Sequence, residues 1–171
     1  MTDIVSIELL LDASTETLLR ADWQRLEAAG LSSLAAHRSA SNRPHITLLA
    51  RPALETCAFG DLVDRLPVAI ALGAPIVFPH AEGSDRGVLA RPVVMTEELR
   101  MLHAAVHAAV SQGDDAPFTA PAEWTPHVTL ARRLLLHRLP DALGLLGPEI
   151  SGTAVTLRRW DSATKTVTDL T

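Results

Sequence analysis

The stretch Arg43-Pro-His-Ile-Thr-Leu-Leu-Ala-Arg51 recurs as Thr125-Pro-His-Val-Thr-Leu-Ala-Arg-Arg133, 82 residues later at every position. One copy lies in each half of the 171-residue chain. We interpret the repeat as an internal duplication, which predicts two structurally related halves. The identical positions are Pro44/Pro126, His45/His127, Thr47/Thr129, Leu48/Leu130 and Arg51/Arg133.

Each copy of the repeat is typical of a β-strand that begins at a proline, because proline has no N–H to give to a sheet ladder. Successive side chains of a strand point to opposite faces. His45 and Thr47 therefore share one face, and so do His127 and Thr129, while the intervening isoleucine, valine and leucine residues point into a core. If the two polar faces line one groove, two imidazoles and two hydroxyls meet at one centre.

The rest of the chain mixes short strands with helices, and no long linker separates the halves. We therefore expect an α+β fold in which residues 1–171 form a single bilobal domain, with antiparallel or mixed sheets. Asp12 or Ser14 is expected to cap the first helix and Thr96 the third, and Pro92 suggests an edge strand. The expected strands are 4–11, 45–50, 68–78 (in two pieces or bulged), 88–94, 127–133, 151–160 and 165–170; the expected helices are 17–29, 54–66, 97–111 and 141–146.

Composition excludes several classes of protein. Apolar residues make up 47% of the chain and charged residues 20%, but no apolar run reaches the ~18 residues of a membrane span. No secretory signal is evident, and the single cysteine, Cys57, excludes an internal disulfide, so we expect a cytoplasmic protein and a monomer. The net charge of −5 argues against binding duplex DNA, and the absence of tyrosine argues against an extended base-stacking platform.

The repeated histidines suit transfer at phosphorus. One neutral imidazole can accept a proton while one imidazolium donates a proton, and threonine hydroxyls can donate to phosphoryl oxygens. This chemistry requires no metal ion or cofactor. A metal site at His103 and His107 is a weaker alternative: their spacing is right, but they lack the adjacent glutamate of a His-Glu-x-x-His motif.

Three arginines and several aromatic residues are candidates for substrate binding. Strict alternation places Arg51 and Arg133 on the histidine face of their strands and Arg132 on the opposite face. Any of them can pair with phosphate oxygens, although a strand-end arginine in solvent is the simpler interpretation. Trp124, and Phe78 or Phe118, can stack on a base, although each of these side chains is more often part of a core.

The paired motifs Pro44–Leu48 and Pro126–Leu130 resemble the two His-x-Thr/Ser-x signatures of the 2H phosphoesterase superfamily. Within it, the chain is similar to the 2′-5′ RNA ligase-like group of RNA 2′,3′-cyclic phosphodiesterases. The resemblance implies two sheets that line a central cleft, with the motifs on central strands and helices outside. It also implies metal-independent opening of 2′,3′-cyclic phosphates of RNA ends or small nucleotides to 2′-phosphates; some relatives also ligate RNA through a 2′-5′ linkage.

Carried over by position, the resemblance makes His45 the proton donor and His127 the proton acceptor. Thr47 and Thr129 then hold the phosphate, and the arginine five residues after the second histidine is Arg132. The first motif continues Leu49-Ala-Arg-Pro52, where many relatives carry a Phe-Leu-Gly-like stretch, which makes a small cyclic nucleotide more plausible as substrate beside an RNA end. The alternative is a catalytically silent module of the same fold that binds nucleotides or RNA ends.

Overall fold

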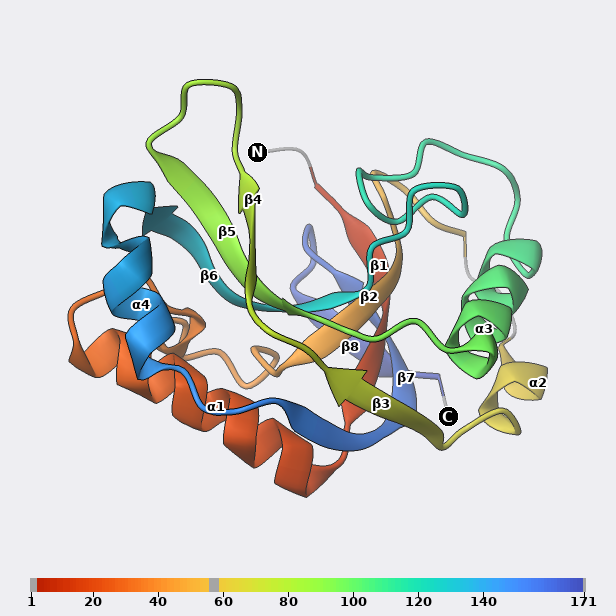
Figure 1. Cartoon of the computed structure of the whole chain (residues 1–171). Coiled ribbons are helices and arrows are strands. Elements are labelled where there is room, and N and C mark those ends of the chain that lie inside the picture. The colour runs from red at the N-terminus through yellow and green to blue at the C-terminus, as the bar shows by residue number, and fades with distance from the viewer. Residues whose placement is uncertain (1–2, 56–58, 171) are drawn as a thin grey trace.

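The structure, a computed structural model, describes residues 3–55 and 59–170 and contains two antiparallel sheets (Figure 1). The first has the strand order β2-β1-β7-β3, with β8 also paired to β7, and the second has the order β4-β5-β6. The predicted α+β class with two sheets is thus confirmed. The bounds are β1 Val5–Leu11, β2 His45–Arg51, β3 Val68–Leu72, β4 Ile76–Pro79, β5 Arg86–Pro92, β6 His127–Leu135, β7 Ile150–Asp161 and β8 Thr166–Asp169.

The helices are α1 (Ala13–Ala28), α2 (Gly60–Val63), α3 (Glu97–Ala108) and α4 (Leu139–Leu145). The side chain of Asp12 accepts hydrogen bonds from the N–H groups of Ser14 and Thr15, and Thr96 caps α3 in the same way. These contacts confirm the caps expected at Asp12 and Thr96. Helix α2 is shorter than predicted, and residues 56–58, including Cys57, lie outside the described residues.

The two halves are interleaved by their helices. Helix α1 follows β1 in the first sheet but also packs against β6 of the second, while α3 from the second half packs against β2 of the first. In Figure 1, α1 and α4 lie on one side of the molecule and α2 and α3 on the other. Both halves therefore contribute to one hydrophobic core, which includes Ile46, Leu48, Val128 and Leu130, all fully buried.

Two tryptophans make matching cross-connections. The indole N–H of Trp23, on α1, donates to the carbonyl of Thr129 at 3.1 Å, and the indole N–H of Trp124 donates to the carbonyl of Thr47 at 3.0 Å. Each half thus supplies a donor to the motif strand of the other half. These bonds satisfy carbonyls on strand edges that have no neighbouring strand to pair with.

The motif strands β2 and β6 are each the edge strand of their own sheet, although they contact one another in the middle of the molecule. The expectation that they are central strands therefore needs correction: they are central to the molecule but not to their sheets. The edge position expected from Pro92 is also wrong, because β5 lies between β4 and β6. Pro92 is tolerated as the last residue of β5, beyond the end of the β4 pairing.

No helix among the described residues is long and apolar enough to cross a membrane.

Candidate active site

The two motif histidines are held in the same way. Nδ1 of His45 lies 2.7 Å from the carbonyl of Arg43, and Nδ1 of His127 lies 2.7 Å from the carbonyl of Thr125. A carbonyl can only accept a hydrogen bond, so Nδ1 carries the proton in each ring. Nε2 is therefore the nitrogen of each imidazole that is left for chemistry. In both copies the acceptor is the residue two positions before the histidine, so the two copies of the repeat fix the same tautomer of their histidine.

A charge on one imidazole acts on the other. Burial lowers the pKa of His127, the hydrogen bond to Thr125 opposes this effect, and a positive charge on His45 lowers the pKa further. The strands that carry the two rings, β2 and β6, are in contact. His127 also contacts Phe78 on β4, with ring centroids 4.9 Å apart, so an apolar wall stands on its side of the site.

The motif threonines, Thr47 and Thr129, are partly buried on the same strands. Their side-chain hydroxyls have no hydrogen-bond partner within residues 3–55 and 59–170. A hydroxyl on a partly buried strand face that lacks a protein partner is available to a ligand or to water. Both threonines can therefore donate to an anion placed between the strands.

Matching β-bulges follow the two motifs. In β2 the pairing to β1 skips Leu48, and in β6 the pairing to β5 skips Leu130, the equivalent residue 82 positions later. A bulge inserts one extra residue and shifts the alternation of all later side chains. Leu130 and Ala131 are both fully buried, and the next residue, Arg132, returns to the histidine face.

The bulge corrects the prediction from strict alternation. Arg132, and not Arg133, lines a cavity of about 380 Å³ together with His45. Arg133 is exposed and lines none of the cavities described below. The position expected from the family resemblance is thus the one that the structure brings to the site.

Glu8, on β1, is a site residue that the sequence analysis missed. Its carboxylate lies 3.6 Å from Nε2 of His45, and its side chain is 4% exposed. It accepts hydrogen bonds from Nε of Arg158 at 2.8 Å and from the hydroxyl of Ser6 at 2.6 Å. Burial alone would raise the pKa of Glu8, but the charges of His45 and Arg158 and these hydrogen bonds hold it below its usual value.

Glu8 gives the two histidines different surroundings. An imidazolium at His45 has an ionised carboxylate beside its Nε2, whereas His127 has no carboxylate partner among the described residues. Thr47, Glu8 and Arg158 are cross-strand neighbours on β2, β1 and β7, so they form one row on the sheet. The sequence does contain a signal for Glu8: it is the charged residue in the segment Val5–Leu11, which is otherwise apolar except for Ser6.

Arg51 does not reach the site. Its side chain is buried, and it donates to Asp115 at 2.6 Å and to the carbonyl of Ser111 at 2.5 Å. The β2 bulge at Leu48 explains this outcome, because it turns Arg51 away from the face that carries His45. Its role is to tie β2 to the segment that follows α3.

Trp124 is half-buried and stacks on His103, with ring centroids 3.9 Å apart and an angle of 9° between the rings. One face of the indole is thus occupied and its N–H is used. Stacking of Trp124 on a base stays a prediction, while Phe118 offers a more accessible ring. Phe118 is 44% exposed and contacts Phe78, which in turn contacts His127.

His103 and His107 lie on α3 and point into the interior. Nε2 of His103 contacts the carbonyl of Thr119 at 3.0 Å, and Nε2 of His107 contacts the carbonyl of Leu48 at 3.2 Å. Burial lowers the pKa of His103 to about 4. Each ring has a backbone partner, which suits a structural role.

The chain is similar to known proteins in sequence profile and in fold. The sequence profile of the 2′-5′ RNA ligase superfamily matches residues 15–171. Among solved structures, the chain is similar to Usb1 of Kluyveromyces marxianus, with a TM-score of 0.50 and 14% identity over 99% of this chain and 98% of that chain. A second structure, of the same Usb1 with uridine monophosphate, gives a TM-score of 0.49 and 15% identity over the same shares of the two chains.

Comparison with curated proteins gives no significant match. The Usb1 likeness is at low identity and bears on the fold alone. The family profile matches nearly the whole chain, and the matched range contains Pro44–Leu48 and Pro126–Leu130. The chain therefore belongs to the 2′-5′ RNA ligase superfamily.

Proposed function

We propose that the protein is a cyclic phosphodiesterase of the 2H type, which opens 2′,3′-cyclic phosphates of RNA ends or nucleotides to 2′-phosphates. The observation that carries the proposal is the matched presentation of two imidazoles, each with Nδ1 bound to a backbone carbonyl at 2.7 Å, so that Nε2 is the nitrogen available for chemistry. Membership of the 2′-5′ RNA ligase superfamily supports it.

In the proposed mechanism, Nε2 of His127 takes a proton from a water molecule whose oxygen attacks phosphorus. The lowered pKa of His127 keeps this ring neutral near pH 7, as a base must be. The P–O3′ bond breaks, and Nε2 of His45 gives its proton to the departing oxygen. The product is a 2′-phosphomonoester, and proton exchange with solvent restores both rings.

The surroundings support this assignment of roles. Glu8 is the anion best placed to compensate a proton on His45, which suits His45 as the proton donor. The hydroxyls of Thr47 and Thr129 can donate to the non-bridging oxygens, and Arg132 can pair with the charge that develops there. Each acid or base contribution is typically worth roughly 10²–10⁴-fold in rate.

The test is hydrolysis of a nucleoside 2′,3′-cyclic phosphate, with the position of the product phosphate determined by ³¹P NMR. We expect a 2′-phosphate, no loss of rate in EDTA, and a loss of at least roughly 100-fold in His45→Ala and in His127→Ala. His137→Ala, which removes an exposed histidine that lies outside both motifs and lines none of the three cavities, is the matched control and should remain active. Wild-type rates in either motif variant would refute the mechanism, and binding without turnover would favour a silent module.

A further inference from the structure

Two neighbouring cavities lie on the His45 side of the site, and His127 lines neither of them. The cavity of about 380 Å³ that includes His45 shares Ser39, Ser41, Arg158 and Lys165 with a second cavity of about 420 Å³. Because they share these walls, the two form one groove, which we call the hairpin groove. Each part has the size of a small-molecule site, so the groove has room for more than a cyclic phosphate.

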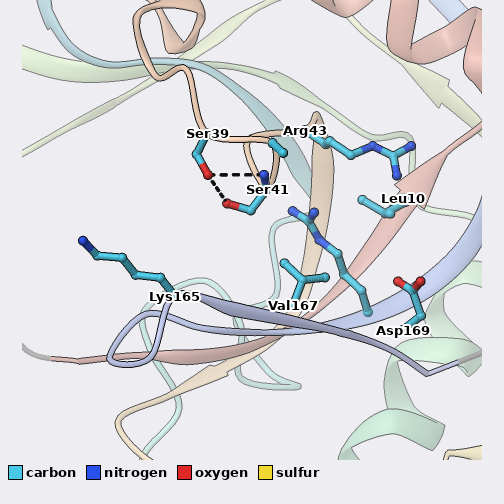
Figure 2. Close-up of a pocket in the computed structure, with 9 residues that line it drawn as sticks. Leu10, Ser39, Ser41, Arg43, Lys165, Val167 and Asp169 are labelled. Atoms are coloured by element: carbon cyan, nitrogen blue, oxygen red, sulfur yellow. Dashed lines mark hydrogen bonds between the residues drawn. The ribbon is translucent and has the colours of Figure 1, made fainter.

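The floor of the hairpin groove is the open face of the first sheet. Glu8 pairs in register with Arg158 on β7, and Arg158 pairs in register with Asp169 on β8. The opposite wall is the loop that carries Ser39 and Ser41, whose hydroxyls lie 2.8 Å apart. Figure 2 shows these serines on one side of the groove and Lys165 across from them, with Asp169 at the far end from Lys165.

The hairpin groove is lined by four cations, Arg43, Arg132, Arg158 and Lys165, and by two anions, Glu8 and Asp169, so it carries positive charge although the whole chain has a net charge of −5. Glu8 is already paired with Arg158. Two other cations on the groove, Arg132 and Lys165, form no salt bridge within the part of the chain that the structure describes. Lys165, the single lysine of the chain, lies in the turn between β7 and β8 and lines both cavities.

The proposed mechanism sets the direction of the substrate in this groove. His45 protonates the oxygen that stays on the ribose, so the ribose lies on the His45 side of the phosphorus. The groove begins at His45 and leads to Lys165. The chain of atoms on the 5′ side of that ribose then runs toward Lys165, away from the Phe78 wall beside His127.

We propose that Lys165, with the hydroxyls of Ser39 and Ser41 opposite it, binds the phosphoryl group on the 5′ side of the nucleotide whose cyclic phosphate is opened. This inference rests on the proposed function. An ammonium group and serine hydroxyls are donors suited to phosphate oxygens. Either a terminal 5′-phosphate of a mononucleotide or the phosphodiester of an oligonucleotide supplies the same chemistry.

The test compares the binding of product-like ligands by calorimetry. Adenosine 2′,5′-bisphosphate should bind wild type roughly tenfold more tightly than adenosine 2′-monophosphate, the size of one charge-assisted hydrogen bond. Lys165→Ala should reduce this ratio to about one without changing the affinity for the monophosphate, and Lys165→Arg should keep most of the ratio. Arg100→Ala removes an exposed cation that lies on α3 and not on the groove, and it should leave the ratio unchanged.

A ratio of one in wild type, or an undiminished ratio in Lys165→Ala, overturns the inference. A dinucleotide that ends in a 2′-phosphate distinguishes the two sources: a gain equal to that of the bisphosphate indicates a phosphodiester ligand, and a gain for the bisphosphate alone indicates a terminal phosphate. Turnover of adenosine 2′,3′-cyclic phosphate is measured in parallel. If wild type turns over the cyclic phosphate but binds the bisphosphate and the monophosphate equally well, the subsite is refuted and the proposed function stands. If the bisphosphate binds more tightly in a Lys165-dependent way but there is no turnover, the subsite stands and the proposed function is refuted.

Because Lys165 is the single lysine, reaction with an amine-selective reagent followed by peptide mass spectrometry gives an independent readout. The 2′,5′-bisphosphate should slow modification of Lys165 relative to the α-amino group, and the 2′-monophosphate should not. Equal rates with the two ligands contradict the proposed contact.

Discussion

Replacing Glu8 by glutamine separates its effect on catalysis from its effect on stability. Glu8 and Arg158 have side chains that are each 4% exposed, and their nitrogen-to-oxygen contacts are 2.7 and 2.8 Å. Removing one partner of a buried ion pair costs about 3–5 kcal/mol, because the other charge stays buried without compensation. Glutamine keeps one acceptor oxygen, so we expect about 3 kcal/mol, or a fall of roughly 6–12 °C in Tm for a chain of this size.

The same substitution removes the anion beside Nε2 of His45. We expect kcat to fall by roughly 10- to 100-fold, the equivalent of one hydrogen bond to a charged group. The acidic limb of the pH profile, which reports His127, should stay below the usual histidine range near pH 6.5, because burial lowers the pKa of that base.

The control is the double variant Glu8→Leu/Arg158→Met, in which both charges are replaced together. Replacement of a whole buried pair by apolar residues is often neutral for stability or better. We therefore expect its Tm to recover to near the wild-type value while kcat stays low. Activity is followed with a nucleoside 2′,3′-cyclic phosphate across pH, and stability by thermal unfolding. Wild-type kcat in Glu8→Gln, with stability lost, would show that Glu8 acts on the fold alone.

Two further predictions concern the bulge and the interior of the second half. Arg132→Ala should lower kcat/KM by at least roughly tenfold while Arg133→Ala changes it less than twofold, since only Arg132 lines the cavity with His45; equal effects would contradict the shifted alternation. Burial lowers the pKa of His103 to about 4, so below about pH 6.5 the unfolded state binds more protons than the folded state. As pH falls from about 6.5 to 4, the free energy of unfolding of wild type should therefore decrease by up to about 3 kcal/mol more than that of His103→Gln. Urea unfolding measures both. Parallel pH dependences in the two proteins would show that His103 does not titrate in this way.

The repeat predicts which strand face carries the histidines and threonines, because that face follows from the local geometry of a strand. His45 and Thr47 lie two residues apart before the bulge at Leu48, so strict alternation holds for them. It fails for Arg51 and Arg132, because a bulge is set by the pairing to a neighbouring strand and leaves no mark on the residues themselves.

The long-range part of the site depends on strand order. Glu8 is 37 positions before His45 in the sequence, and it reaches the imidazole only because β1 pairs with β2. Lys165 reaches the groove because the β7–β8 hairpin places its turn beside the Ser39–Ser41 loop. Periodicity assigns a strand to each of these segments but does not say which strands are neighbours.

The most direct test of the central claim is a crystal structure of the protein with adenosine 2′-monophosphate. The account predicts that the 2′-phosphate lies between β2 and β6, with oxygens about 2.6–3.2 Å from Nε2 of both His45 and His127 and within reach of both threonine hydroxyls. A phosphate that contacts only one of the two imidazoles, or that binds elsewhere on the molecule, would contradict the claim that the repeat builds one reaction centre.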